Sequence, residues 1–306
     1  MAAPENDGIL IIDKPVDWTS HDVVAKMRGI LKTRRIGHTG TLDPFATGVL
    51  VVCVNRATRL VQFLTGHDKE YLATIRLGWR TETGDLTGQP LGDPVEARNI
   101  NEAMILGALD HFRGRIRQTP PMFSAKKIAG RKLYELAREG REIEREPIEV
   151  TISDLELLSL DTPTASPTSL DLEVRVTCSA GTYIRTLAED IGQQLGIGAH
   201  LVALRRIRAG NCRIEQAITL EELTEIARAG ETAKHLQDMA ATLDLPILPL
   251  TSEELVSIGH GRPLPCADHW SAHQLVSLCD QLGHLMAIAA YDPDRRTLAP
   301  RVVLMP

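Results

Sequence analysis

The sequence has few aromatic residues, no closely paired cysteines and no long apolar run. Aromatic residues make up only 4% of its 306 residues, and none of the five cysteines lies in a C-x-x-C pair. An odd number of cysteines without paired spacing argues against a disulfide framework and predicts reduced thiols in a cytoplasmic protein. The longest apolar runs are much shorter than a membrane span, and the first residues are polar and acidic. We therefore expect neither a signal peptide nor an association with a membrane.

Several motifs that are typical of cofactor binding or of a Ser or Cys nucleophile are also missing. The segment from Gly37 to Gly40 lacks the Lys-Ser/Thr ending of a P-loop, and no G-x-G-x-x-G follows a strand. No Ser or Cys occupies a nucleophile elbow. His269 and His273 lie near Cys266 and Asp268, but these four residues lack the spacing of a zinc site. The sequence therefore does not favour a metal centre.

Acidic residues outnumber basic ones, 40 against 34, and the net charge of −6 argues against a protein that coats nucleic acid nonspecifically. The positions of the basic residues are more informative, because three basic stretches contain no acidic residue. Any one of them alone is typical of a solvated surface. Together they indicate a focused surface for nucleic-acid phosphates. The residues concerned are Lys32, Arg34 and Arg35; Arg113, Arg115, Arg117, Lys126, Lys127, Arg131 and Lys132; and Arg205, Arg206, Arg208 and Arg213.

The most informative segment is the turn-rich stretch from Gly37 to Gly48, which precedes the apolar run Val49–Val54. It contains a single carboxylate, Asp43, among glycines that let a ligand approach the backbone closely. Asp43 is therefore a candidate for chemistry above a buried strand. The residues next to Asp43 allow a second interpretation. Asp43 followed by Pro44 is also a good helix start, with the Asp43 carboxylate as N-cap.

The pattern of apolar residues predicts an α+β fold. Strands and helices do not alternate strictly, which favours a mixed, largely antiparallel sheet flanked by helices over a parallel doubly wound sheet. Composition changes to short strands and turns near residues 245–250, so we expect a first domain at 1–247 and a small β-rich domain at 248–306. Strands are expected at 8–13, 49–54, 71–77, 148–158, 170–178 and 201–208, helices at 20–31, 57–64, 101–112, 132–139, 182–195 and 219–235, and a loop at 81–99.

Five motifs, taken together, closely resemble the TruB family of tRNA pseudouridine synthases. Their order and spacing match the family over about residues 8–215, and a weaker resemblance continues into a PUA-like module. One departure is Asp17-Trp18, where the family usually has Gly followed by an apolar residue. The motifs are GILIIDKPxxxTSHDVV from Gly8, GHTGTLDPFATGVL from Gly37, KEY from Lys69 with RTETGD from Arg80, QTPPMFSAK from Gln118, and CSAGTYIRTLA from Cys178.

The resemblance implies the pseudouridine synthase fold and an isomerisation of uridine in RNA to pseudouridine, without a cofactor or a metal. It makes Asp43 the nucleophile, places Tyr71 against the target base as the candidate acceptor of the C5 proton, and pairs Arg185 with Asp43. The chemistry agrees, because a carboxylate nucleophile must stay ionised in a desolvated pocket, and a neighbouring guanidinium lowers its pKa.

The resemblance also implies which residues bind the substrate. His38, Tyr183 and Leu204 match positions that line the pocket of the flipped nucleotide, although each could equally be a packing residue. Asp85 matches an acid of the active-site region, although an Asp in a Thr-Gly-Asp turn is ordinary. Lys126, in the basic stretch, is expected to contact the RNA.

The expected substrate is the uridine at position 55 in the T loop of tRNA, bound through the T arm by an RNA-gripping insertion at about 113–140. We expect a monomer without an obligatory protein partner. Two alternatives remain open: a tRNA-folding chaperone or RNA-binding module whose catalysis is dispensable, and a guide-RNA-dependent pseudouridine synthase subunit. A chain that only folds RNA would not need Asp43, Tyr71 and Arg185 together.

Overall fold

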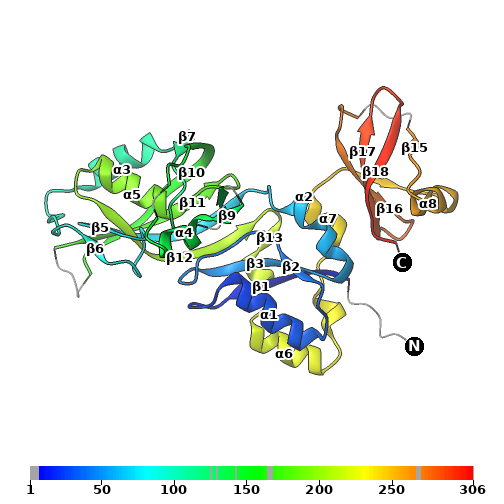
Figure 1. Ribbon diagram of the computed structural model, residues 1–306, viewed down its shortest axis with the longest axis horizontal. Coiled ribbons are helices and arrows are strands. Elements are labelled where there is room, and N and C mark those ends of the chain that lie inside the picture. Colours follow the sequence, from blue (N-terminus) through cyan, green and yellow to red (C-terminus); the bar gives the residue numbers. More distant parts are fainter. Residues whose placement is uncertain are drawn as a thin grey trace.

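The computed structural model describes residues 7–124, 126–128, 130–141, 143–163, 168–266 and 270–305, except for the side chains of residues 127, 128, 132, 134 and 138. The molecule is elongated, with one large sheet and a smaller β-rich part at the end that carries the C-terminus (Figure 1). No helix in these ranges is long and apolar enough to cross a membrane.

The large sheet is mixed but almost entirely antiparallel. Its strand order is β1-β3-β12-β4-β11-β10-β7, with β2 beside β3 and β13 beside β12. Only the short contact between β12 and β3 is parallel. The predicted α+β class is therefore confirmed. The strands are β1 Gly8–Lys14, β2 Ile36–His38, β3 Thr47–Val54, β4 Lys69–Leu77, β7 Gly114–Gln118, β10 Ile148–Asp161, β11 Leu170–Cys178, β12 Ala199–Ala209 and β13 Cys212–Arg213.

Two pairs of helices cover separate parts of this sheet. Helices α1 (Ser20–Leu31) and α6 (Leu220–Arg228) pack against the β1–β3 end, while α3 (Glu102–His111) and α5 (Ile184–Gln194) bury apolar residues against β4, β10, β11 and β12. Helix α1 begins where the sequence predicts, because Thr19 and Asp22 form a capping box. Two pairs of helices on one sheet thus bury two apolar clusters.

Some elements differ from the expectation. The helix expected at 57–64 is a 3₁₀ turn (η1, Asn55–Leu60) followed by α2 (Val61–Leu64), and the helix expected at 219–235 divides into α6 and η3 (Thr232–His235). The loop expected at 81–99 contains a short hairpin, β5 (Arg80–Thr81) with β6 (Pro90–Leu91). Glycines and prolines do not show from sequence alone which turn residues will pair.

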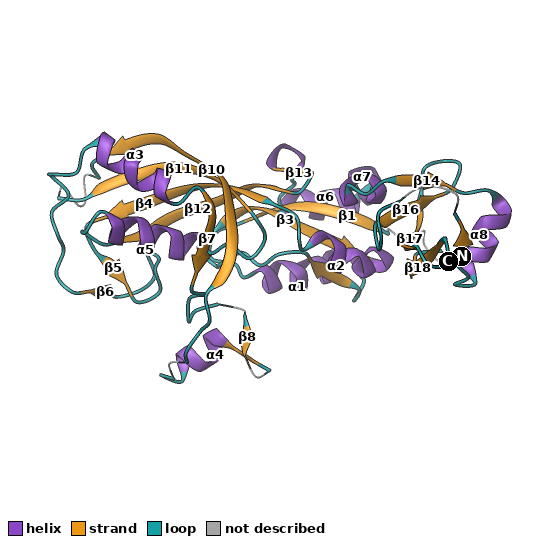
Figure 2. Ribbon diagram, turned by 90° about the horizontal axis from the view of Figure 1, so that it is seen from above, coloured by secondary structure: helices purple, strands orange, loops and turns teal. Residues whose placement is uncertain are grey.

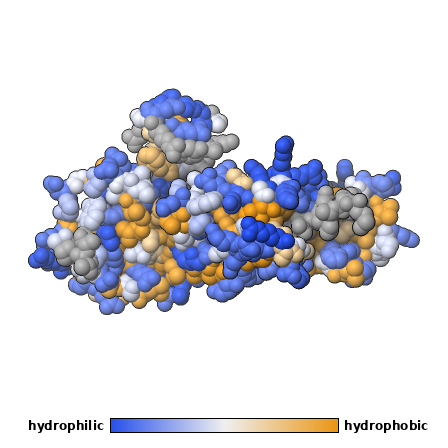
Figure 3. All heavy atoms as spheres, turned by 90° about the horizontal axis from the view of Figure 1, so that it is seen from below, coloured by the Kyte–Doolittle hydropathy of each residue, from blue (hydrophilic) through white to orange (hydrophobic). Residues whose placement is uncertain are grey.

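The second half of the basic stretch projects from the body. It comprises β8 (Lys127–Ile128), β9 (Arg131–Lys132) and α4 (Leu133–Arg138), which stand away from the large sheet in the perpendicular view (Figure 2). The space-filling view shows the same projection beyond an elongated surface on which hydrophilic and hydrophobic residues alternate (Figure 3). This part of the chain is therefore accessible from several sides.

The small C-terminal part is β-rich, as expected. Its sheet has the order β14-β16-β17-β18-β15, formed by Ile247–Pro249, Leu275–Cys279, Leu285–Asp292, Thr297–Val303 and Leu264–Pro265, with α8 (Ser252–Gly259) beside it. Residues Ile288 and Val302 join a core cluster with Ile9 and Val49 of the large sheet. The remaining short elements are η2 (Ile214–Gln216) and α7 (Met239–Leu243).

Asp43 does not cap a helix, so the local interpretation of Asp43-Pro44 as a helix start is wrong. The chain makes a turn there, in which the amide of Ala46 donates to the carbonyl of Asp43 at 3.1 Å. Gly48 then lies at φ +97°, and a Cβ at this position would stand 2.2 Å from the carbonyl oxygen of Arg206. The close approach of β3 to β12 below the Asp43 turn therefore requires glycine.

Replacing this glycine tests the packing directly. We expect Gly48→Ala to lower the free energy of unfolding by at least ~2 kcal/mol, because it combines a backbone clash with strain at positive φ. At Gly29, inside α1, an added Cβ would meet nothing within 4 Å, so Gly29→Ala is a control that should be neutral or stabilising. Thermal unfolding midpoints of both variants give the comparison, and a midpoint of Gly48→Ala equal to that of the parent chain contradicts the packing argument.

Candidate active site

A pocket of about 390 Å³ opens at the Asp43 turn. It lies where the ends of β4 and β12 meet the loop that leads into α5 and the stretch that follows β7. Segments far apart in the sequence thus contribute to one cavity. Its lining includes Thr39 to Asp43, Thr65, Lys69, Tyr71, Ser124, Lys126, Ser179 to Arg185, Leu204 and Arg206.

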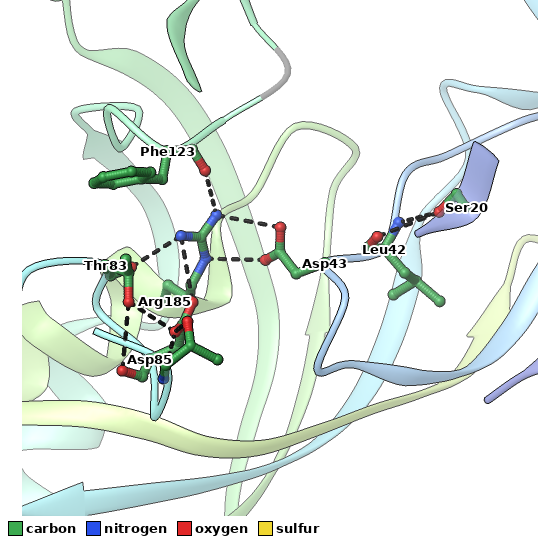
Figure 4. Close-up of polar contacts among 8 residues, drawn as sticks. Ser20, Leu42, Asp43, Thr83, Asp85, Phe123 and Arg185 are labelled. Carbon is green, nitrogen blue, oxygen red and sulfur yellow. Dashed lines mark hydrogen bonds and ion pairs between the residues drawn. The ribbon is translucent and has the colours of Figure 1, made fainter. Parts of the chain in front are cut away.

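The centre of the pocket is an ion pair between Asp43 and Arg185 (Figure 4). Nε of Arg185 lies 2.9 Å from Oδ2 of Asp43, and Nη2 donates to Oδ1 at 3.3 Å. The Asp43 side chain keeps 34% of its surface exposed, whereas that of Arg185 keeps only 6%. The carboxylate is therefore accessible to a ligand, while the cation behind it is fixed.

The guanidinium of Arg185 is held by three further acceptors. Nη1 donates to the carbonyl of Thr83 at 2.9 Å, Nη2 donates to the carbonyl of Phe123 at 2.6 Å, and Oδ2 of Asp85 lies 3.6 Å from Nη1. Asp85 is itself held by the hydroxyls of Thr83 and Thr87 at 2.7 and 2.6 Å. It does not line the pocket, so its contact with the site runs through Arg185.

Two opposing effects determine the protonation of Asp43. Burial raises the pKa of the Asp43 carboxyl, and the Arg185 charge and hydrogen bond oppose this rise. The sequence led us to expect a pKa lowered by the guanidinium, but burial is the larger effect. Arg185 therefore limits the rise in the pKa of Asp43.

Two residues that the sequence analysis did not select fix the backbone on either side of Asp43. The buried hydroxyl of Ser20 accepts from the amide of Leu42 at 2.9 Å and donates to its carbonyl at 3.2 Å (Figure 4). Lys14 is fully buried, and its Nζ donates to the carbonyls of Trp18 and Pro44 at 2.5 and 3.1 Å. Both belong to the first motif, but only their long-range partners reveal this role.

Tyr71 lies in the pocket on β4, next to Arg206 on β12. The two residues are cross-strand partners, and both are buried. Burial raises the pKa of the Tyr71 phenol, and the Arg206 cation opposes this shift because it favours the phenolate. Leu204 precedes Arg206 by two residues on the same face of β12, and it also lines the pocket.

The remaining predicted site residues divide into two groups. Tyr183 and Lys126 line the pocket, and Gln118 fixes Tyr183 by accepting from its amide at 3.0 Å. His38 is not among the lining residues; it packs edge-on against His21, with ring centroids 5.5 Å apart. Burial lowers the pKa of His38 to about 4, so its ring is neutral near pH 7.

Several of the basic residues have acceptors within the protein. Arg205 pairs with Asp13 at 2.7 Å, Arg208 pairs with Glu70 at 2.9 Å, and Arg206 is buried in the pocket. Arg113 donates to the carbonyl of Leu155 at 2.6 Å. The expectation that Arg206 presents a cation on the surface was wrong, because the side chain is buried and the carbonyls of Val49 and Gly40 accept from it. Arg205 keeps 39% of its side chain exposed beside Asp13. The side chain of Lys127 lies outside the described residues.

Within the described part of the chain, no group of three or more His, Cys, Asp and Glu residues could hold a metal ion. Asp268 and His269, which the sequence places near Cys266 and His273, lie outside the described residues.

Comparison with known proteins agrees with the fold and shows the family. Two family models match successive parts of the chain: the N-terminal domain of the TruB family pseudouridylate synthases at residues 28–184, and the tRNA pseudouridylate synthase B C-terminal domain at residues 185–252. The fold and the two matched family models thus define a pseudouridylate synthase, which is an isomerase. The chain belongs to the TruB family.

Individual relatives span most of the chain. The tRNA pseudouridine synthase B of Solibacter usitatus is 42% identical over 287 residues, which cover 92% of this chain and 94% of the relative. The tRNA pseudouridine synthase B of Mycobacterium leprae is 45% identical over 262 residues, which cover 85% of this chain and 80% of the relative. Among solved structures, the crystal structure of a Cbf5-Nop10-Gar1 complex contains a similar chain with a TM-score of 0.75 and 28% identity, covering 98% of this chain and 86% of that one.

The balance at Asp43 predicts a pH dependence. Arg185→Ala removes the cation that opposes the effect of burial, so the pKa of Asp43 rises further and the acid limb of the pH–rate profile moves to higher pH. We also expect the rate at neutral pH to fall about 10²-fold or more, since a fixed charge contact is lost. Arg185→Lys keeps the charge but loses the planar fork, and it should remain well below the parent rate.

The measurement is pseudouridine formation across the pH range. Arg76→Ala is a matched control, because Arg76 pairs with Asp171 at 2.7 Å on the same sheet and does not line the pocket. An Arg185→Ala enzyme with an unshifted acid limb and a near-normal rate would show that the two side chains do not act together.

Proposed function

We propose that this protein converts the uridine at position 55 in the T loop of tRNA to pseudouridine, with Asp43 as the nucleophile. The observation that carries the proposal is the accessible Asp43 carboxylate, held 2.9 Å from a buried arginine in a pocket that also contains Tyr71. A nucleophilic carboxylate requires this combination of access, desolvation and a fixed counter-charge.

In the proposed reaction Asp43 attacks C1′ of the target ribose, and the bond from C1′ to N1 of uracil breaks with its electron pair on the base. The base then turns, its C5 bonds to C1′, and Asp43 leaves. N1 finally gains a proton and C5 loses one, so the product is an isomer of the substrate. Tyr71 is the candidate acceptor of the C5 proton, and the Arg206 cation beside it supports that role by favouring the phenolate.

The uridine must leave its stack to reach Asp43, at a cost of roughly a few kcal/mol. Tyr71, Tyr183 and Leu204 line the pocket and could compensate by contacts with the flipped nucleotide. We place Lys126 at the RNA, Asp85 behind Arg185 as a positioning residue, and His38 at the loop close to the pocket. Residues 1–247 would form the catalytic domain with an RNA-gripping insertion at 113–140, and residues 248–306 an RNA-binding domain.

Asp43→Asn tests the central assignment, because it keeps the shape of the side chain and removes its charge. We expect turnover to fall at least ~10³-fold, as is usual when a nucleophile is removed, while tRNA binding changes little. Asp17→Asn is the matched control: Asp17 is an exposed carboxylate on the adjoining loop, with its amide bonded to the carbonyl of Pro44 at 2.9 Å. Pseudouridine is measured in an unmodified tRNA transcript, with nothing but the purified protein added.

The same assay separates the alternatives. Modification of the transcript at position 55 without a guide RNA supports the stand-alone enzyme without an obligatory partner, which we propose to be a monomer. Activity that appears only with a guide RNA and added proteins would favour a guide-dependent subunit instead. A chaperone role would be favoured if the Asp43→Asn variant had all the effects on tRNA that the parent protein has. Substantial product from Asp43→Asn at long times would refute the proposed nucleophile.

The exposed arginines of β7 give a separate test of RNA binding. Arg117 is exposed on β7, in the basic stretch that precedes the pocket residues Ser124 and Lys126. We expect Arg117→Ala to weaken tRNA binding and to reduce the slope of log K against log salt by about 0.7–0.9. The single-turnover rate at saturating tRNA should be nearly unchanged, because a phosphate contact positions the RNA. Arg228→Ala, on the exposed surface of α6, is the control, and equal slopes for the two variants would mean that β7 does not contact phosphates.

A further inference from the structure

Two buried cations in the pocket have no contact with the RNA assigned to them in the reaction described above. Lys69 and Arg206 are only 8% and 2% exposed, yet both line the cavity that contains Asp43. No carboxylate of the described residues lies within salt-bridge distance of either one. Both cations donate instead to backbone oxygens: Nζ of Lys69 to the carbonyls of Thr65 and His67, and Arg206 to those of Gly40 and Val49.

The two cations lie side by side. A Cβ built on Gly40 would stand 3.5 Å from Nη1 of Arg206 and 4.0 Å from Cε of Lys69, so both side chains border the same glycine. Burial lowers the pKa of Lys69 to about 8, and the neighbouring Arg206 contributes to this shift. Repulsion between two like charges in a partly dry pocket is unfavourable, and the carbonyl dipoles compensate for it only in part.

Hydrogen-bonding capacity is left over for a ligand. An ammonium group has three donors and a guanidinium has five. The backbone oxygens take two from each cation, and the Tyr71 phenol takes a further one from Arg206. Two adjacent cations with spare donors, at a pocket wall with a glycine between them, have the composition of an anion site. A bound phosphate would offset both the repulsion and the cost of burial.

We propose that Lys69 and Arg206 form an anion subsite that holds a backbone phosphate of the RNA next to the target uridine. This inference rests on the proposed function, because a nucleotide that enters the pocket brings its flanking phosphates with it. The subsite would fix the ribose relative to Asp43 while leaving the base free to turn. Lys69 also lies next to Thr65, the C-cap of α2, so a purely structural role for it is the alternative that the test must separate.

The test removes the charge from the protein and from the RNA in turn. Three T-arm stem-loop RNAs are compared: the natural one, and two in which a neutral methylphosphonate replaces the phosphate on the 5′ or the 3′ side of the target uridine. Binding is measured with Asp43→Asn protein, so that no turnover intervenes. We expect one of the methylphosphonates to weaken binding about tenfold or more, as is typical of a lost charged hydrogen bond.

Lys69→Met should weaken binding of the natural RNA by a similar factor. The Lys69→Met protein should bind the natural RNA and the methylphosphonate RNA that weakens binding with equal affinity. Lys69→Arg, which keeps the charge, should restore the discrimination. Lys26→Met, an exposed lysine on α1 outside the pocket, should behave like the parent protein. If Lys69→Met lowers the thermal unfolding midpoint, binding of the same RNAs to Lys69→Gln protein, and the effect of the methylphosphonates on the protein that keeps Lys69, still show whether the subsite exists.

The subsite is overturned if neither methylphosphonate weakens binding to the Asp43→Asn protein that keeps Lys69. It is also overturned if the loss of binding free energy from Lys69→Met and the loss from the methylphosphonate simply add. Either result would leave Lys69 as a structural residue at the end of α2. Pseudouridine formation by the active parent protein on the natural RNA is measured in parallel. Its failure would refute the proposed function, whereas an active parent protein with additive losses refutes the subsite alone.

Discussion

The ion pair between Asp43 and Arg185 is the constraint on which the rest of the site depends. A carboxylate taken out of water gains protons unless a cation stays beside it, and a buried cation in turn needs acceptors for its own donors. Arg185 meets this requirement with the carbonyls of Thr83 and Phe123 as well as with Asp85. Segments from separate parts of the chain must therefore converge before the Asp43 carboxylate has a fixed counter-charge.

Backbone carbonyls held by buried cations recur around the pocket. Lys14 binds the carbonyl of Pro44, Arg206 binds those of Gly40 and Val49, and Lys69 binds that of Thr65. The turn around Asp43 has no regular secondary structure to satisfy its polar groups, so long cationic side chains from β1 and β12 do so instead. This arrangement explains why so short a loop keeps a defined shape, and why cations that look like surface residues in the sequence are buried.

Sequence reasoning succeeded where the signal is local. The capping box at Thr19, the alternation in β4 and the amphipathic α5 are all readable from neighbouring residues, and each forms close to its predicted bounds. The glycine-rich turn also singled out Asp43, although Arg185 and its pairing with Asp43 came from the resemblance. The same reasoning failed for Arg206, because the carbonyls of Val49 and Gly40 that accept from it are 157 and 166 residues away and only the folded chain brings them together.

By itself, the sequence determined which segments become strands and helices, and which chemical groups are available: one carboxylate on a glycine-rich turn, a tyrosine on a strand and an arginine at a helix start. These depend on periodicity, capping and turn chemistry, which act over a few residues. Only the tertiary structure decided which cations face water and which enter the pocket, that Asp85 acts through Arg185, and that Ser20 and Lys14 fix the Asp43 turn. These depend on strand order and burial, because the strength of a charge interaction and the cost of an unpaired donor are set by the surroundings that distant residues create.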